Sequence, residues 1–413
     1  MTITDISKFI QKHAPNAEIV CPINQFAGGK IAIDAPQWLW TYWSIAQKEV
    51  VNNTDVAVND VERENIIKLW LDKIYYAIKK FLSYQIIPVF VFDGQFPEEK
   101  HDLQEERREG RQIKKEKINE YRNLLESVDV LERTADMTDT YRKLLRQDTL
   151  IKKTDLDMIK IILHAIGLPV NIASGEAEQL CAMLNREHLV NAVLSADRDT
   201  LVHGAPLLIK RLTRVSGQEC FEITQLHQIL KETCLTQEMF IDMCIMSGCD
   251  YNNHQRIPRI GIIKAYKLIK DYDSIDNLPA KFDTRCLKYQ RCREMFKPQS
   301  AKDSCQGDIQ LTINSQNMID KREVIESYGL EHWLDQLPSL YKQLENAEQL
   351  ENAEQIVHTN TDTNTDTEQI GHTDTDAEQD QHIRTLVIKN SIKPLPLEDL
   401  TNALLQSVNE NNI

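Results

Sequence analysis

The sequence contains no run of 18 consecutive apolar residues, and its first 30 residues lack a basic start followed by an apolar stretch. The first absence excludes a helix that spans a membrane, and the second predicts that there is no secretory signal peptide. Nine cysteines are present, an odd number, and no two of them form a Cys-x-x-Cys pair. This spacing argues against a zinc site and against a disulfide framework. We therefore expect an intracellular protein, not a secreted one, with reduced thiols.

Basic residues are too few to balance the acids. The chain has 48 Lys and Arg against 63 Asp and Glu, which gives a formal net charge of -15. Such an excess opposes binding to nucleic acid, because Lys and Arg are the residues that bind phosphates. However, residues 343–413 carry 14 acids and 3 bases, a net -11, which leaves only -4 for residues 1–342. The acidity is therefore mainly a property of the C-terminal part.

This C-terminal part also differs in composition. Residues 343–355 contain Leu-Glu-Asn-Ala-Glu-Gln twice in succession, and residues 358–381 consist largely of Thr, Asp, Asn, Glu and Gln. Such segments have too little apolar surface to offset the entropy of ordering. We predict an acidic, mostly disordered tail over 343–413. Its apolar segments at 385–388 and 395–408 indicate a loosely attached end, a terminal helix or a partner-binding peptide.

Apolar runs alternate with helical periodicities in the first 342 residues. Three runs are rich in β-branched residues and end in aspartate, at 30–34, 87–93 and 192–197. Helical patterns cover 66–82, 155–166, 175–185 and 238–247. Ser174 is the expected N-cap of the third helix. This alternation predicts an α/β fold with a mostly parallel central sheet flanked by helices on both faces.

Acidic residues follow the strands of this predicted sheet. The carboxyl ends of parallel strands share one edge, which is where such sheets bind ligands. The acids expected at this edge are Asp34, Asp93, Glu176, Glu178, Asp197, Asp199 and Asp250. One aspartate at a strand end is most often a cap or turn residue, but several converging carboxylates repel each other unless a cation is bound. Oxygen ligands favour Mg²⁺ or Mn²⁺, and two such ions about 3.5 to 4 Å apart support phosphodiester hydrolysis.

Four motifs carry a resemblance to a known family. They are Phe-Asp-Gly at 92–94, Ser-Gly-Glu-Ala-Glu at 174–178, Ala-Asp-Arg-Asp at 196–199 and Ser-Gly-Cys-Asp-Tyr at 247–251. Their order and spacing resemble the acidic motifs of the structure-specific 5′ nucleases, the flap endonuclease family, over residues 1 to about 280. The resemblance implies a PIN-like 5′ nuclease fold and two Mg²⁺ or Mn²⁺ ions held by the seven acids. It also implies branched or nicked DNA as the substrate, and none of the seven acidic positions is lost.

Two basic residues extend the resemblance. The family has a Lys and an Arg that reach the scissile phosphate from the helix after the second aspartate, and Lys100 and Arg107 stand at these places. Seven residues are two helical turns, so both should lie on one helix face. Cations fixed there would stabilise the charge of the transition state. Without the acids, an ordinary solvated helix surface would be the simpler interpretation.

The segment between the first two motifs resembles the family's helical arch. It separates Asp93 from Glu176 by 82 residues, far fewer than the spacer of the excision-repair members. Residues 107–122 carry seven Lys or Arg against three acids, and residues 142–153 carry five against one. Two basic helices could funnel a single strand toward the metals, and we predict DNA contacts from Arg108 and Arg111. A solvated charged face is the alternative.

Residues 256–265 resemble the family's helix-two-turn-helix, whose turn brings backbone amides to duplex phosphates and binds a K⁺ ion. We predict DNA contacts from Arg259, Gly261 and Lys264. The loop is about two residues longer than in flap endonucleases, and Arg259 replaces the first of two usual glycines. Both departures argue against a K⁺ site.

Two tryptophans follow the first aspartate of the site. Trp40 stands where flap endonucleases have a tyrosine that stacks on a terminal base, and an indole can stack in the same way. Core packing is the alternative, and Trp38 fits it better. The family usually begins Met-Gly-Ile-x-Gly-Leu, whereas this chain begins Met-Thr-Ile-Thr-Asp-Ile. The apolar spacing of Ile3 and Ile6 is kept, although both glycines are missing.

The expected organisation is a nuclease region at 1–99, the helical arch at 100–155, a second nuclease region at 156–250, the helix-two-turn-helix and C-terminal helices at 251–342, and the tail. No Gln-x-x-hydrophobic-x-x-aromatic-aromatic sequence for a sliding clamp is found. We expect a monomer that cleaves 5′ flaps or other branched DNA in replication or repair, in the nucleus or at a replication site. A 5′ to 3′ exonuclease on nicked or gapped duplex and a catalytically silent junction-binding protein are the alternatives.

Overall fold

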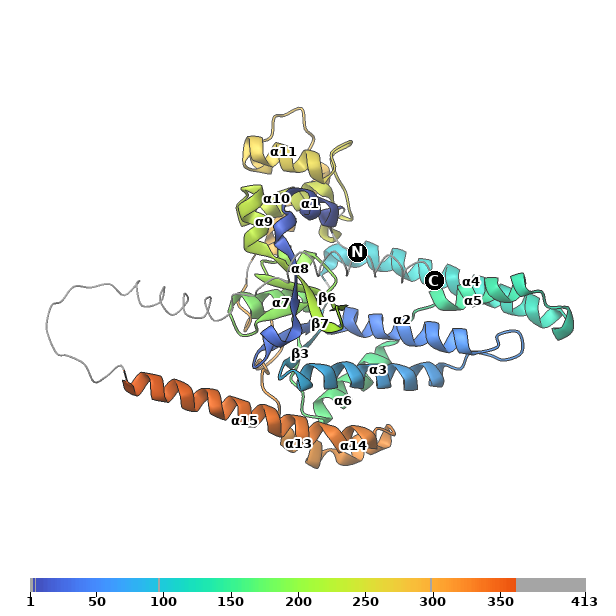
Figure 1. Cartoon of the computed structure of the whole chain (residues 1–413). Helices are drawn as coiled ribbons and strands as arrows, with labels where there is room; N and C mark the ends of the chain where they lie inside the picture. The colour runs from blue at the N-terminus through green and yellow to red at the C-terminus, as the bar shows by residue number, and fades with distance from the viewer. Residues whose placement is uncertain (1–2, 4, 96, 298, 362–413) are drawn as a thin grey trace.

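A seven-stranded sheet forms the centre of the computed structural model (Figure 1), which describes residues 3, 5–95, 97–297 and 299–361. The strand order is β1-β7-β6-β5-β2-β3-β4, and β7 is antiparallel to both of its neighbours. The strands are β1 (Glu18–Pro22), β2 (Lys30–Asp34), β3 (Ile87–Phe92), β4 (Val170–Ile172), β5 (Ala192–Leu194), β6 (Leu207–Val215) and β7 (Gln218–Gln225). The sheet is therefore mostly parallel, as the alternating pattern predicted.

Helices cover both faces of this sheet. The connection from β2 to β3 contains α2 (Ala35–Asn53) and α3 (Arg63–Ser83), and the connection from β4 to β5 contains α7 (Ala177–Arg186). These connections run in opposite directions along the sheet, and right-handed crossovers therefore place their helices on opposite faces. All six residues of β3 are buried as a result. The predicted α/β class with a sheet flanked by helices is confirmed.

Two long helices project from the sheet as a hairpin. They are α4 (His101–Ser127) and α5 (Ala135–Gln147), and they extend beside α2 (Figure 1). A small hydrophobic cluster, separate from the main core, joins the hairpin to α2 and the loop after it; its buried members are Val51, Val56, Ile118, Leu125, Tyr141 and Leu145. The Gln47 amide also donates to the backbone oxygens of Leu145 and Asp148, at 2.6 and 2.7 Å. We call this unit the α4–α5 hairpin.

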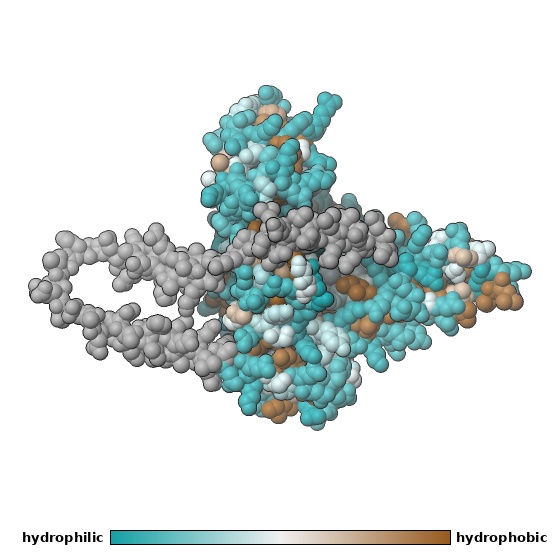
Figure 2. Space-filling model, in the orientation of Figure 1, coloured by the Kyte–Doolittle hydropathy of each residue, from teal (hydrophilic) through white to brown (hydrophobic). Residues whose placement is uncertain are grey.

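The free end of the α4–α5 hairpin is apolar. Figure 2 shows apolar surface there, and Leu131 in the connection between the two helices is 94% exposed. Val130 and, in the α2–α3 loop, Val58 are exposed as well. The basic stretches of the hairpin therefore lie along its length and not at its end.

The remaining helices form two groups on either side of the sheet (Figure 1). One group contains α1 (Ile6–His13), α9 (Leu226–Thr233), α10 (Gln237–Ser247), α11 (Ile262–Tyr272) and α12 (Tyr289–Phe296). The other contains α6 (Lys153–Ala165), α13 (Ser315–Asp320), α14 (Arg322–Ser327) and α15 (Glu331–Thr361), and α8 (Asp199–Val202) follows β5. Short 3₁₀ helices are η1 (Pro15–Ala17), η2 (Ile23–Phe26), η3 (Glu98–Lys100), η4 (Val130–Glu132), η5 (Asp250–Asn252), η6 (Ile275–Asn277) and η7 (Arg285–Leu287). Among the described residues, no helix combines the length and the hydropathy needed to cross a bilayer.

The predicted disorder of the tail is wrong for its first part, because α15 continues to Thr361. Trp333, Leu337, Tyr341 and Leu344 are buried along this helix. The repeat that follows is rich in Ala, Leu, Glu and Gln, which are strong helix formers, so a helix anchored by packing can continue through it. The rest of the tail, 362–413, and its apolar segments at 385–388 and 395–408 lie outside the described residues.

Candidate active site

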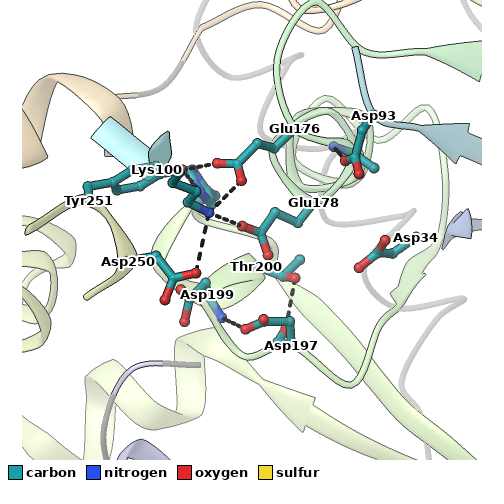
Figure 3. A network of polar contacts seen from close by, with 12 residues as sticks. Asp34, Asp93, Lys100, Glu176, Glu178, Asp197, Asp199, Thr200, Asp250 and Tyr251 are labelled. Atoms are coloured by element: carbon teal, nitrogen blue, oxygen red, sulfur yellow. Dashed lines mark hydrogen bonds and ion pairs between the residues drawn. The ribbon is translucent and has the colours of Figure 1, made fainter. Parts of the chain in front are cut away.

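The seven predicted acids meet beyond the carboxyl ends of the parallel strands (Figure 3). Asp34 ends β2, and its register opposite Val91 of β3 brings Asp93 to the same edge. The other acids are Glu176 and Glu178 at the start of α7, Asp197 and Asp199 at the start of α8, and Asp250 at the start of η5. Asp34, Glu176, Asp199 and Asp250 are each at most 7% exposed. We call these seven side chains the carboxylate cluster.

Backbone contacts fix the loop that carries Glu176. The Gly94 amide donates to the Gly175 oxygen at 2.8 Å, and the Ser174 amide donates to the Ser304 oxygen at 2.8 Å. A Cβ atom on Gly94 would lie 1.9 Å from the Ala173 oxygen, so only glycine allows this close approach. The glycine of the Phe-Asp-Gly motif is therefore needed to bring Asp93 next to the start of α7.

The predicted N-cap of α7 is corrected by the structure. The helix begins at Ala177, and Glu176 occupies the N-cap position. The Ser174 hydroxyl instead donates to the Asp303 oxygen at 3.3 Å. Asp93 accepts from the Ala177 amide at 2.9 Å, so a carboxylate from the neighbouring strand end satisfies the first turn of the helix. A sequence pattern cannot show a cap that comes from 84 residues away.

Burial and mutual repulsion raise the pKa of several members of the carboxylate cluster. Burial, followed by repulsion from Asp93, raises the pKa of Asp34 to about 7, although the Ser195 hydroxyl donates to it at 2.8 Å. Burial, followed by repulsion from Asp197, raises the pKa of Asp199 well above its usual value. Burial is also the largest cause of the raised pKa of Glu178. The cluster therefore holds more negative charge than its own cations offset.

The donor set of this cluster fits a hard divalent cation. All seven side chains offer carboxylate oxygens, the ligands that Mg²⁺ and Mn²⁺ prefer. No three His, Cys, Asp or Glu side chains within the described ranges are already arranged around a common metal position. The Lys100 ammonium lies among the oxygens instead (Figure 3), and it supplies the positive charge in this arrangement.

Lys100 is enclosed by three members of the carboxylate cluster. Its Nζ atom pairs with Glu176 Oε1, lies 3.5 Å from Glu178 Oε1 and lies 3.7 Å from Asp250 Oδ2. Burial opposes its charge, but the three carboxylates outweigh burial and raise the pKa of Lys100. The side chain is thus a buried and permanently charged ammonium at the centre of the site.

Arg107 reaches the same site from a different element. Its Nη2 atom lies 3.3 Å from Asp250 Oδ2, and its side chain is 42% exposed. Lys100 ends η3 and is the N-cap of α4, whereas Arg107 lies within α4. The predicted single helix face is therefore wrong in detail, although both cations reach Asp250. The backbone changes from a 3₁₀ turn to an α-helix between them.

Several contacts to the carboxylate cluster come from residues that the sequence did not single out as site residues. The Tyr251 hydroxyl donates to Glu176 Oε2 at 2.6 Å, and His254 Nε2 lies 3.1 Å from Asp250 Oδ1. The Ile3 amide donates to Asp199 Oδ1 at 3.0 Å. Tyr251 and Ser195 each lie within two residues of a predicted acid, which is a signal that could have identified them. His254 lies four residues after Asp250, so its contact is also local. The contact of Ile3 depends on the tertiary fold.

The predicted DNA-binding residues divide into two groups. Trp40, which is 49% exposed, lines a hollow of about 430 Å³ together with Arg107 and Arg111. Arg108 lines an adjoining hollow on α4 with the same two arginines. Trp38, in contrast, is 8% exposed and packs on Phe90.

The second group lies in the turn before α11. Arg259 and Lys264 line another hollow, with Lys267 and Lys281. Arg259 has a φ of 65°, the left-handed conformation that glycine adopts most easily. The Lys264 ammonium donates to the Arg259 oxygen at 2.9 Å, and Gly261 is the N-cap of α11.

Comparison with the sequences of known proteins identifies the family that the acidic motifs resemble. Residues 1–115 match the family model described as the XPG N-terminal domain, and residues 167–250 match the XPG I-region. Flap endonuclease 1 of Enterocytozoon bieneusi (strain H348) is 31% identical over 298 residues, 72% of this chain and 77% of the relative. Flap endonuclease 1 of Glycine max is 30% identical and covers 72% of this chain and 75% of its own length.

Solved structures give the same fold. Flap endonuclease-1 from Methanococcus jannaschii matches with a TM-score of 0.51 and 20% identity, over 80% of this chain and 97% of its own. The catalytic core of Rad2 in complex with DNA substrate matches with a TM-score of 0.53 and 17% identity, over 81% and 99%. The resemblance to this family that the sequence motifs indicated is thereby confirmed. This chain belongs to the flap endonuclease family of structure-specific 5′ nucleases.

Proposed function

We propose that the carboxylate cluster is the catalytic centre of this nuclease and that it cleaves 5′ flaps or related branched DNA. The convergence of all seven acids on one buried position next to Lys100 and Arg107 carries the proposal. A catalytically silent DNA-binding relative would have no need to collect seven carboxylates in one place, where burial raises the pKa of Asp34, Glu178 and Asp199. A bound cation offsets the free energy that the burial of these carboxylates costs.

The seven acids would hold two Mg²⁺ or Mn²⁺ ions. When bound, such ions supply an activated water and neutralise charge on the leaving oxygen of a phosphodiester. Asp34 and Asp93 would be ligands from the strand ends, Glu178 and Asp199 from the first turns of α7 and α8, and Asp197 from the loop before α8. In the turn before α11, the Lys264 ammonium already donates to the Arg259 oxygen, which argues against a K⁺ ion at this oxygen.

The chain's own cations would act on the phosphate. Lys100 is held next to the reacting centre by three carboxylates, so its charge needs no rearrangement of solvent when negative charge develops on the phosphate. Arg107 adds a second, more exposed charge from α4. Trp40 offers a ring face beside Arg107 and Arg111, which suits stacking on a base next to the cleaved bond.

Product mapping tests this proposal. The purified chain should be incubated in Mg²⁺ with end-labelled flap, nicked, gapped and four-way DNA, and Asp197→Ala should be assayed in parallel, with Asp139→Ala as an exposed matched control. We expect cleavage near the base of the 5′ flap, no cleavage by Asp197→Ala with DNA binding retained, and ordinary cleavage by the control. Near-normal turnover of Asp197→Ala would disprove the site. Stepwise mononucleotide release from nicked duplex would instead identify a 5′ to 3′ exonuclease.

A further inference from the structure

A buried histidine lies behind the carboxylate cluster. His203 follows α8, is 1% exposed and has its Nε2 atom 3.2 Å from the Tyr251 hydroxyl. Its ring packs on Phe296 with ring centroids 4.9 Å apart, and Tyr251 packs on the same phenylalanine at 5.0 Å. The histidine contacts the cluster through Tyr251.

The hydrogen-bond geometry determines which ring nitrogen of His203 carries its proton. The Tyr251 hydroxyl has one hydrogen, and it donates to Glu176 Oε2 at 2.6 Å. Glu176 is the acceptor in this contact, and the Lys100 ammonium donates to its other oxygen. The hydroxyl therefore has no hydrogen left for His203, so the 3.2 Å contact requires that Nε2–H of His203 donates to the Tyr251 oxygen.

The surroundings of the ring agree with this tautomer. Burial, together with the charge of Lys100, lowers the pKa of His203 to about 3, so the ring is neutral and carries one N–H. Within the part of the chain that the structure describes, His203 Nδ1 is buried and has no hydrogen-bond partner. A bare Nδ1 leaves no N–H unsatisfied, whereas the other tautomer would bury an unpaired donor.

Tyr251 connects this histidine to both charges at the centre of the site. Its hydroxyl holds one oxygen of Glu176, and the Lys100 ammonium lies 4.7 Å from the centre of its ring. A hydrogen bond from His203 limits rotation of the hydroxyl and directs its hydrogen toward Glu176. We propose that His203 is a positioning residue of the nuclease, which acts through Tyr251 to hold Glu176 and Lys100 in place. The inference rests on the proposed roles of Glu176 and Lys100.

Four variants test this proposal in the full-length protein. His203→Phe keeps a ring but removes the donor, His203→Gln returns an amide donor near Nε2, and Tyr251→Phe removes the connection. Thr233→Val is the matched control, because it also deletes a buried hydrogen bond, from the Thr233 hydroxyl to the Ile229 oxygen, outside the cluster. Single-turnover cleavage of a flap at saturating enzyme and DNA affinity in Ca²⁺ are measured for each.

We expect His203→Phe to cleave about tenfold more slowly, with affinity unchanged within about twofold, since one hydrogen bond is lost. His203→Gln should recover most of the rate, and Thr233→Val should cleave normally. The decisive variant is His203→Phe combined with Tyr251→Phe, which should be no slower than Tyr251→Phe alone, because the histidine acts only through the tyrosine. A further tenfold loss in the double variant would overturn the proposal, as would a slow His203→Gln with an ordinary melting temperature.

The tautomer gives a second test that needs no cleavage. Nitrogen-15 shifts of the histidine rings, assigned to His203 by comparison with His203→Gln, should show a neutral ring protonated at Nε2 at pH 7. Protonation at Nδ1 would overturn the inference even if the protein is an active nuclease. If wild-type protein shows this tautomer but cleaves no DNA, the proposed function fails and the hydrogen-bond chain stands.

Discussion

Lys100 at the carboxylate cluster and the exposed cations of the turn before α11 lie in very different surroundings. Lys100 is 7% exposed and lies among three carboxylates, whereas Arg259 and Lys264 are exposed beside Lys267 and Lys281. A cation that is already paired with carboxylates contributes little binding free energy with a distant phosphate, but its position is fixed before the substrate arrives. An exposed cation binds phosphate by releasing counterions, and its contribution depends on salt. Lys100 should therefore control the rate of cleavage, and the exposed cations should control the affinity for DNA.

Removal of Lys100 is the strongest test of this difference. Lys100→Ala should lower the single-turnover rate by about 10² to 10³ fold, because a preorganised charge near the phosphate is lost. The dissociation constant for flap DNA should change by less than about threefold. Rapid-quench cleavage and fluorescence anisotropy measure the two quantities. Arg107 makes one such contact and is more exposed, so Arg107→Ala should lower the cleavage rate less. Equal losses of rate and affinity would show that both residues are general DNA contacts.

The buried carboxylates make a prediction about stability in EDTA. The folded-state pKa of Asp34 is raised to about 7, so the folded protein binds more protons than the unfolded chain between about pH 4 and 7. The free energy of unfolding should therefore fall as pH rises through this range, and the melting temperature should fall by several degrees between pH 5 and 8. Calorimetry in EDTA measures this slope.

Asp34→Asn provides the control for the pH experiment. The variant keeps the size of the side chain and removes one titrating group, so its slope should be shallower than that of the wild type. Millimolar Mg²⁺ should also flatten the slope of the wild type by neutralising the carboxylates. A melting temperature that rises with pH in EDTA would contradict the charge imbalance inferred for the carboxylate cluster.

The exposed cations should show the opposite behaviour to Lys100. Arg259→Gly keeps the left-handed backbone without strain and removes the side chain together with its charge. The dissociation constant should rise about three- to tenfold at 50 mM salt, and the slope of log K against log salt should fall by about 0.9. The cleavage rate at saturating enzyme should stay within about twofold. A tenfold loss of that rate would place the turn before α11 in the catalytic step.

Truncation of the tail should have the smallest effect. A chain that ends at Thr361 loses 10 acids and 3 bases, so DNA affinity at low salt should be unchanged or up to about twofold higher, with the gain lost at physiological salt. Cleavage should persist. A chain that ends at Lys342 is the informative comparison, because it also loses Leu344, which is 5% exposed, and should melt several degrees lower. Equal melting temperatures would show that α15 beyond Lys342 contributes nothing to stability.

The sequence predicted the carboxylate cluster because two rules agree for Asp34, Asp93 and Asp197. Each aspartate ends an apolar run, and parallel strands bring such ends to one edge of the sheet. The hydrogen bonds around the cluster were not predictable, since the Asp93 cap of α7 and the contact of Ile3 with Asp199 join residues that are 84 and 196 positions apart. Local patterns carry no information about such pairs.

The helix α15 shows a different limit of sequence interpretation. The polar composition of its part beyond residue 342 indicated disorder, but Trp333 and Tyr341 in the preceding turns are buried and anchor the helix. Once these turns are fixed, each further residue adds a hydrogen bond at little cost in a sequence of good helix formers. Helix propensity in the repeat was visible from the sequence, whereas the anchoring contacts were not.

The separate hydrophobic cluster of the α4–α5 hairpin has a consequence for exchange kinetics. The six buried residues of this cluster are few compared with the main core. Leu131, at the free end of the hairpin, is 94% exposed. A unit with so few buried contacts opens at a lower free energy than the whole protein unfolds. The amide hydrogens of α5 should exchange with solvent well before those of β2 and β3. The α4–α5 hairpin can thus open and close many times while the strands that hold Asp34 and Asp93 stay folded.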